Sequence, residues 1–394
     1  MAPSCSRQVF SRIMEDYEEG LLADSRARHV YSERRARRLA RKQAEELCKQ
    51  VRSVSRAIAG PRDRMGRLAS MARMRALLQR QPLTHILNRV DFTSYHSSRA
   101  YYAEYVFPLF QMLSSISYQD DVAQAIKMLL PEAVPLNRRL ERMSLWVRKG
   151  VVFWERIRIS AALSPSALLV VVPNGRYCDV VIAVRGTSTR QDMVTDLLCR
   201  PRDLVLMDAT RMRDLIGQRR DPKVHAGFGD YHVKLYACLM PRLQRIMTSM
   251  PRYSNSQFRF FLTGHSAGGV ATVLAIALGE AFRGRTFCFS YGAPYLGNKD
   301  FNDLLRHPDI GIRKSFRLYN GRDIVPCVQA FKGYQHADLM LEAKGEHAQH
   351  LVGLDLQALT EKAAAPHLKR LSALRKPLFW HSNFSYDGKH VFTM

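Results

Sequence analysis

Ser266 lies in a five-residue pattern whose residue types could carry nucleophilic catalysis. The pattern Gly264–Gly268 reads Gly-His-Ser-Ala-Gly; it follows the apolar run Phe258–Leu262 and leads into the small, apolar segment Ala267–Leu278. A serine at a sharp turn between strand and helix has a strained backbone and an exposed hydroxyl, and a Cβ on either flanking glycine would press the helix off the strand. Because about one chain in eight of this length carries the pattern by chance, the strand and helix around it are what favour a nucleophilic Ser266 over a structural serine.

Acyl transfer also needs two hydrogen-bond donors that face the developing oxyanion. The backbone N–H of Ala267 lies at the start of the expected helix and can be the first donor. Thr187 follows Gly186 in the loop after the expected strand Val180–Val184, so its N–H, with its hydroxyl as a further candidate, can be the second. An ordinary loop between a strand and a helix is the alternative interpretation of this segment.

An acid and a histidine would complete the chemistry. Asp323 follows the expected strand Ser315–Tyr319, which is where a carboxylate can orient a histidine, although a turn or helix cap is the alternative role for such an aspartate. We prefer His381 as the base because the apolar residues before it can anchor a loop at the rim of the site, and His367 is the second choice. The later histidines are His336, His347, His350, His367, His381 and His390.

Alternating strand and helix patterns must position these residues. Asn174-Gly175 is a strong turn signal and predicts a hairpin that leads into the strand Val180–Val184. The other expected strands are Val151–Ile159, Ala167–Pro173, Phe258–Leu262, Thr286–Tyr291 and Ser315–Tyr319. The expected helices are Tyr101–Tyr118, Asp121–Leu130, Gln191–Leu198 and His232–Met247. We expect these elements to belong to an α/β fold with a central, mostly parallel sheet flanked by helices.

The chain is strongly basic, and its basic residues are concentrated at one end. The 394 residues carry a net charge of +25, and residues 1–90 hold 20 Lys and Arg against 9 Asp and Glu. This part has a helical pattern of apolar residues, so we expect a basic helical N-terminal extension over 1–90 and a catalytic domain over 95–394. Such a helix can bind an anionic membrane surface or a partner helix, and the alternative is a solvated helix that packs on the catalytic domain.

The cysteine content and the hydropathy of the sequence bear on the cellular compartment of the protein. The seven cysteines are an odd number and show no spacing typical of a zinc site, which favours a reduced, intracellular environment. The chain has no run of 18 apolar residues and no apolar signal segment at its N-terminus. We therefore expect an intracellular protein, cytoplasmic or peripheral on an organelle membrane, that is not secreted and has no transmembrane helix.

Taken together, the motifs resemble the fungal-type triacylglycerol lipase family, class 3, which has the α/β-hydrolase fold. The resemblance covers the chain from about Tyr95 onward and leaves residues 1–90 outside. The matching segments are Val184–Thr187 with Asp192–Leu197, Val224–Phe228, Thr263–Gly269, Tyr291–Pro294 with Gly297–Asn298, and Asn320–Pro326. The resemblance implies that Ser266 is the nucleophile, Asp323 the acid and His381 the base, with Thr187 and Ala267 as the oxyanion hole. It also implies a lid helix over about 189–198.

The expected function is serine-dependent hydrolysis of acylglycerol esters at a membrane or lipid surface, without a metal or cofactor. A phospholipase A1 is an equally plausible enzyme, so the substrate is an acylglycerol or a phospholipid. An inactive, lipase-like module that binds a membrane or a protein is the alternative of another class. Nucleic-acid binding would rest on charge alone, because no motif in the sequence supports it. The sequence leaves the oligomeric state open.

Overall fold

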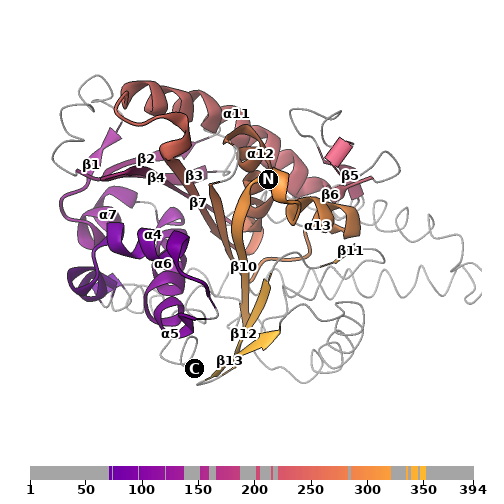
Figure 1. Ribbon diagram of the computed structural model, residues 1–394, viewed down its shortest axis with the longest axis horizontal. Coiled ribbons are helices and arrows are strands. Elements are labelled where there is room, and N and C mark those ends of the chain that lie inside the picture. The colour runs from indigo at the N-terminus through magenta and orange to yellow at the C-terminus, as the bar shows by residue number, and fades with distance from the viewer. Residues whose placement is uncertain are drawn as a thin grey trace, which may run out of the picture.

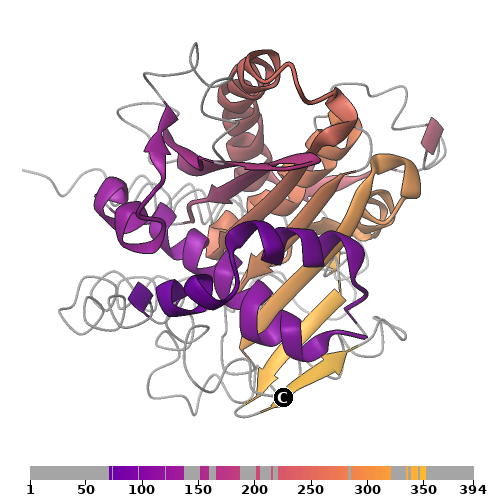
Figure 2. The same cartoon turned by 60° about the vertical axis from the view of Figure 1, so that its left-hand side comes forward.

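The computed structural model describes most of the expected catalytic domain and a short part of the segment before it. The residues described are 71–72, 74–95, 97–119, 121–136, 151–158, 166–186, 201–204, 214–215, 221–282, 285–320, 334–335, 339–344 and 347–351. Within them a large sheet lies between two groups of helices, with α11 and α12 on one face and α4 to α7 on the other (Figure 1). Figure 2 shows α4 to α7 in front of the strands that they cover.

The central sheet is mostly parallel, which confirms the predicted fold class. Its strand order is β1-β2-β3-β4-β7-β8-β10-β12-β13 among the described residues. The strands from β4 to β12 pair in parallel, and antiparallel pairing joins β2 to β3, β3 to β4 and β12 to β13. The strand bounds are β1 Val134–Pro135, β2 Phe153–Arg158, β3 Ser166–Asn174, β4 Tyr177–Val184, β7 Phe258–His265, β8 Thr286–Tyr291, β10 Ile312–Asn320, β12 Leu339–Lys344 and β13 His347–Leu351.

Every strand that the sequence predicts in this part of the chain is present. The predicted hairpin is also present, because β3 and β4 pair from Asn174 and Tyr177 onward and Gly175 has a φ of 51°. A smaller sheet has the order β11-β9-β6-β5. Its strands are β5 Pro201–Asp203, β6 Lys223–His225, β9 Gly297–Asn298 and β11 Tyr334–Gln335.

The helices follow the sequence patterns with two differences. The expected helix Tyr101–Tyr118 contains a π-helical segment, η2, that ends two residues before Pro108, a residue that cannot donate a backbone hydrogen bond within a helix. The expected helix His232–Met247 begins six residues earlier, because the His225 side chain accepts a hydrogen bond from the Phe228 N–H and caps it. The bounds are α4 Leu83–Phe92, α5 Arg99–Tyr101, η2 Tyr102–Val106, α6 Phe107–Ser117, α7 Val122–Leu129, α11 Ala226–Ser249, η5 Asn255–Gln257, η6 Ser266–Gly269, α12 Val270–Phe282, α13 Lys299–Leu305 and η7 Pro308–Ile310.

The central strands are buried on both faces, and alternate residues enter two hydrophobic cores. In β7, Phe260 and Leu262 pack in the core beneath α11 and α12, whereas Phe261 packs in the core beneath α4 and α6. All eight residues of β7 are buried, as expected for a central parallel strand covered on both sides. The strand that leads to Ser266 is therefore held rigidly by contacts on both faces.

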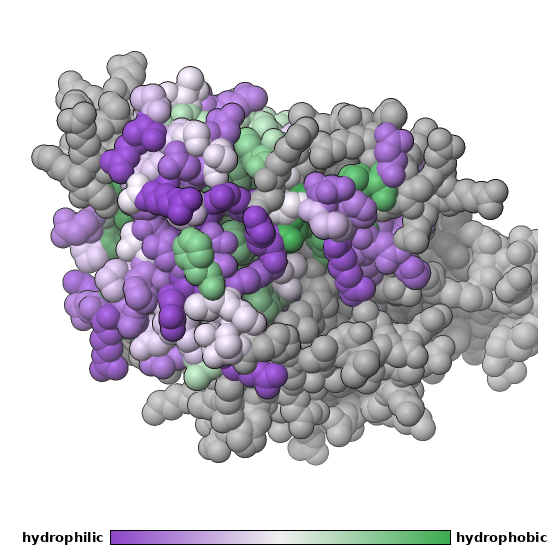
Figure 3. All heavy atoms as spheres, viewed as in Figure 1, coloured by the Kyte–Doolittle hydropathy of each residue, from purple (hydrophilic) through white to green (hydrophobic). Residues whose placement is uncertain are grey.

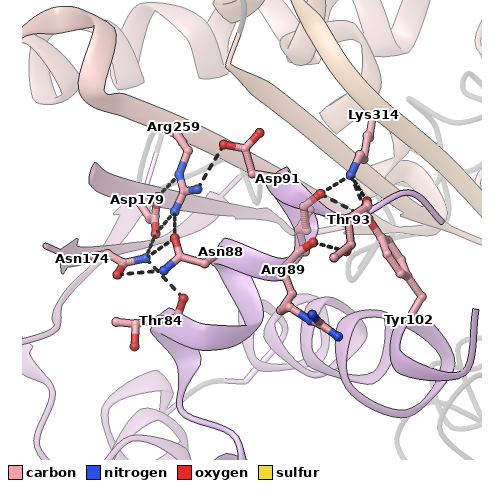
Figure 4. A network of polar contacts seen from close by, with 11 residues as sticks. Thr84, Asn88, Arg89, Asp91, Thr93, Tyr102, Asn174, Asp179, Arg259 and Lys314 are labelled. Carbon is pink, nitrogen blue, oxygen red and sulfur yellow. Dashed lines mark hydrogen bonds and ion pairs between the residues drawn. The ribbon is translucent and has the colours of Figure 1, made fainter. Parts of the chain in front are cut away.

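A buried arginine joins α4 to the sheet at the end of β7 opposite to Ser266 (Figure 4). Arg259 is paired with Asp179 of the neighbouring strand, with its Nε 2.6 Å from one carboxylate oxygen and its Nη2 2.8 Å from the other. The same guanidinium donates to Asn88 at 2.8 Å and contacts Asp91 at 3.2 Å, both in α4. Burial raises the pKa of Asp179, and the hydrogen bonds from Arg259 and Asn174 oppose that rise.

These contacts bear on the start of the packed domain. Ile86, Leu87 and Val90 of α4 are fully buried in the same core as the sheet. A lysine from β10 also reaches this helix, because the Nζ of Lys314 donates to the carbonyl of Thr93 at 2.5 Å and to that of Val90 (Figure 4). The division into an extension over 1–90 and a domain over 95–394 stays a prediction, and the contacts favour counting α4 with the domain.

Candidate active site

Ser266 occupies the tip of the turn between β7 and the helix that follows. Its φ is 57°, and no other non-glycine residue in the described ranges has a positive φ. A left-handed conformation costs a non-glycine residue about 1–3 kcal/mol, so it persists only where the surrounding structure imposes it. His265 and Ala267 are buried on either side, whereas Ser266 is partly exposed. The turn therefore presents the serine at the surface of a rigid strand.

Two glycines allow this turn to be as tight as it is. A Cβ on Gly264 would overlap the carbonyl of Gly268, and a Cβ on Gly268 would lie 2.6 Å from the carbonyl oxygen of Val184. The two glycines therefore bring the helix onto the ends of β7 and β4. This confirms the expectation that a Cβ at either position would press the helix off the strand.

The loop after β4 lies directly against the serine turn. Val184 pairs with Gly264 in the parallel register, so β4 and β7 end side by side. A Cβ on Gly186 would overlap the carbonyl of His265 and would lie 3.1 Å from the backbone nitrogen of Gly268. Thr187 is the next residue and lies outside the described residues. Ala267 is buried at the start of η6, where backbone N–H groups lack intrahelical partners.

Two tyrosine contacts at this place could not be predicted from the sequence. The Tyr118 hydroxyl donates to the carbonyl of His265 at 2.9 Å, and the Tyr231 hydroxyl donates to the carbonyl of Arg185 at 2.6 Å. The partners are 147 and 46 residues apart, so no local pattern connects them. For the Tyr118 contact, the aromatic helix predicted over Tyr101–Tyr118 was the feature of the sequence that could have indicated it.

Several predicted site residues lie outside the described ranges. These include Asp323, His381 and the segment 189–198 that was expected to form a lid. β10 ends at Asn320, three residues before Asp323, and one strand separates it from β7. His350, one of the later histidines, lies in β13, which pairs antiparallel with β12. The described part of the site therefore contains the proposed nucleophile, Ala267 and the loop residue before Thr187.

Two general features of the described chain bear on cofactors and membranes. The described ranges contain no group of three or more His, Cys, Asp or Glu side chains that could hold a metal ion. Among the helices that the structure describes, none combines the length and the apolar character that a membrane span requires.

Comparison with known proteins finds a family match that includes the turn of Ser266. Residues 181–332 match the family described as lipase (class 3). The Lip2 lipase from Yarrowia lipolytica is 23% identical, with 50% of this chain and 67% of that chain covered and a TM-score of 0.40. A native Rhizomucor miehei lipase propeptide complex is 20% identical over 64% of this chain and 70% of that chain, with a TM-score of 0.41. A lipase from Rhizopus microsporus var. chinensis is 19% identical over 67% of this chain and 85% of that chain, with a TM-score of 0.46.

The residues that match the family include the segments that form the described site. It begins in β4, before the loop of Gly186, and it includes the turn of Ser266 and the segment after β10. The order of strand, turn and helix at Ser266 is the structural context that the serine pattern requires. Residues 181–332, which include the turn of Ser266, therefore match the class 3 lipase family, and this match supports a carboxylic ester hydrolase of the lipase type.

Proposed function

We propose that this chain is a serine-dependent lipase that hydrolyses the carboxylic ester bonds of acylglycerols at a membrane or lipid surface. The observation that carries the proposal is the left-handed conformation of Ser266 at the end of β7, inside the segment that matches the lipase family. A serine held in this way can reach an ester carbonyl from the surface while its neighbours stay buried. The reaction requires no metal or organic cofactor.

The proposed mechanism is acyl transfer to water through a covalent intermediate. Ser266 attacks the ester carbonyl while His381 takes its proton, and Asp323 orients and stabilises the charged imidazole. His381 then returns the proton to the leaving alcohol, and water releases the fatty acid by the same steps. The backbone N–H groups of Thr187 and Ala267 bind the oxyanion in each tetrahedral intermediate. The position of Ala267 beside Ser266, and of Gly186 against the turn, supports this assignment.

Charge supports action at an anionic surface. The net charge of +25 attracts the chain to membranes that carry anionic lipids. On the face shown in Figure 3 the described surface is mainly hydrophilic, with small and separate apolar areas. Of the large hydrophobic side chains in the described ranges, Phe92 and Val233 are the exposed ones. The positive charge, rather than the apolar side chains of the described surface, is therefore what favours binding to a lipid surface.

The same charge favours a second candidate, a phospholipase A1. An anionic phospholipid would bring its ester bonds to a basic enzyme, and the acyl transfer chemistry at Ser266 would be unchanged. A third candidate, a catalytically inactive module, would bind the surface without hydrolysis. The three candidates differ in the product that appears when the chain is mixed with lipid.

A substrate comparison tests the proposal. The full chain is incubated with emulsions of triacylglycerol and diacylglycerol and with vesicles of phosphatidylcholine containing phosphatidylserine, and released fatty acids are measured. We expect release from the acylglycerols that is absent with Ser266→Ala. Release of the fatty acid from the sn-1 position of phospholipids alone would favour the phospholipase A1. Binding to vesicles with no release from any lipid would contradict the enzymatic proposal.

The assignment of the base leads to a separate prediction. His381→Ala should lower kcat on a soluble p-nitrophenyl ester by about 10³-fold or more, because the serine loses its proton acceptor. His367→Ala serves as the matched control and should retain most of the activity. The measurement is steady-state kinetics together with thermal melting of each variant. If His367→Ala loses activity while His381→Ala keeps it, His367 is the base.

A further inference from the structure

Two tyrosine hydroxyls, one from each face of the central sheet, bind the backbone on either side of the candidate oxyanion hole. We propose that Tyr118 and Tyr231 are positioning residues that hold the loop carrying the second oxyanion donor at a fixed distance from Ser266. The inference rests on the proposed function, since it takes Thr187 as that donor. Neither tyrosine needs to touch the substrate.

Tyr118 connects the serine turn with the loop after β4. It follows α6, which belongs to the core on one face of the sheet. Its hydroxyl donates to the His265 carbonyl at 2.9 Å and lies 3.4 Å from Nδ1 of the same histidine. A Cβ on Gly186 would overlap this hydroxyl, so the oxygen is also in direct contact with the loop. One hydroxyl thus contacts both the residue before Ser266 and the residue before Thr187.

Tyr231 holds the same loop from the opposite face. It lies in the second turn of α11 and is buried in the core on that face. Its hydroxyl donates to the Arg185 carbonyl at 2.6 Å, two residues before Thr187. Because the backbone leaves β4 at Val184, this hydrogen bond restrains the first peptide of the loop. Tyr231 therefore holds the Arg185 carbonyl by a hydrogen bond, and Tyr118, on the other face of the sheet, limits the movement of Gly186 by direct contact.

The catalytic effect of such a restraint follows from the geometry of oxyanion binding. A donor acts only when it lies about 3 Å from the position that the oxyanion will occupy, and losing one donor costs about 10²–10³-fold in kcat. A displacement of about 1 Å can cost 10²-fold. Loss of either tyrosine hydroxyl leaves the other in place, so each single variant should lose only part of this factor. Loss of both should approach the effect of losing the donor.

Tyrosine-to-phenylalanine variants test the inference because they remove only the hydroxyl. We expect Tyr118→Phe and Tyr231→Phe each to lower kcat on a soluble ester by about tenfold, with KM changed by less than about twofold. The double variant should lose about 10²-fold. Affinity for a trifluoromethyl ketone, which forms an oxyanion when a serine adds to it, should fall in parallel with kcat.

A third tyrosine supplies the matched control. The Tyr102 hydroxyl is buried and donates to the Val90 carbonyl at 3.2 Å, in α4 and away from the serine turn. Tyr102→Phe should lower the melting temperature by an amount comparable to the other two variants and leave kcat and ketone affinity unchanged. If Tyr118→Phe and Tyr231→Phe show this same pattern, their hydroxyls are merely structural and the inference is overturned. A wild-type chain without esterase activity would instead overturn the proposed function, and this inference with it.

Discussion

Ser266→Ala is expected to lower the kcat for ester hydrolysis by about 10⁵- to 10⁶-fold while the protein remains folded. The substitution removes the atom that attacks the carbonyl, and the oxyanion donors alone cannot form the covalent intermediate. Alanine keeps the volume of the side chain at this turn nearly constant, so the packing of Gly264 and Gly268 stays intact. The measurement is hydrolysis of a short-chain p-nitrophenyl ester by full-length protein.

A second substitution at the same position separates chemistry from backbone strain. Ser266 has a φ of 57°, which alanine tolerates no better than serine but glycine adopts readily. Ser266→Gly should therefore be as inactive as Ser266→Ala and about 1 kcal/mol more stable. Turnover retained by either variant would show that another residue is the nucleophile. Equal stability of the two variants would show that the strain is absent.

The sequence predicted the frame of the site well because short, periodic patterns determine it. The apolar run before Ser266 and the small residues after it gave β7 and α12, and Asn174-Gly175 gave the hairpin between β3 and β4. The glycines around Ser266 could be explained from the sequence alone, because a tight turn leaves no room for a Cβ. Residues that are neighbours in the sequence determine strands and turns of this kind.

The same reasoning could not predict contacts between segments that are far apart in the sequence. The hydroxyls of Tyr118 and Tyr231 reach backbone carbonyls far along the chain, and a tyrosine in an apolar helix gives no sign of its partner. The early start of α11 was missed because His225 is an uncommon helix cap. The roles of Thr187, Asp323 and His381 stay predictions, since they lie outside the described residues. Spacing alone cannot choose among the late histidines.

Asp179 and Arg259 did leave a signal in the sequence, and they carry the largest expected effect on stability. Each is the one Asp, Glu, Lys or Arg residue of its buried strand, and the parallel register places them opposite each other. Both side chains have a relative exposure of 0%. Burial lowers the pKa of Arg259, but the hydrogen bonds and charges of Asp179 and Asp91 outweigh burial and raise it. The guanidinium therefore stays charged and depends on these partners.

Asp179→Ala should lower the free energy of unfolding by about 3–5 kcal/mol, because it leaves a buried guanidinium without its bidentate partner. Replacing both residues, as Asp179→Leu with Arg259→Met, should recover much of that loss, since neither member of the fully buried pair remains without the other. The exposed pair Lys299 and Asp303 is the matched control, and Lys299→Ala should cost less than about 0.5 kcal/mol.

Denaturant unfolding of the full chain measures these differences in the free energy of unfolding. The kcat of each variant is a second measurement. Arg259 is the second residue of β7, and Ser266 follows the last, which places the two about 20 Å apart along the strand. The kcat of the folded fraction should therefore be unchanged in Asp179→Ala at a temperature well below its melting point. A stability loss no larger than that of Lys299→Ala would contradict the buried pair. A fall in kcat without a fall in stability would mean that the two ends of β7 are coupled, because β7 and its neighbour β4 join Asp179 to the serine turn.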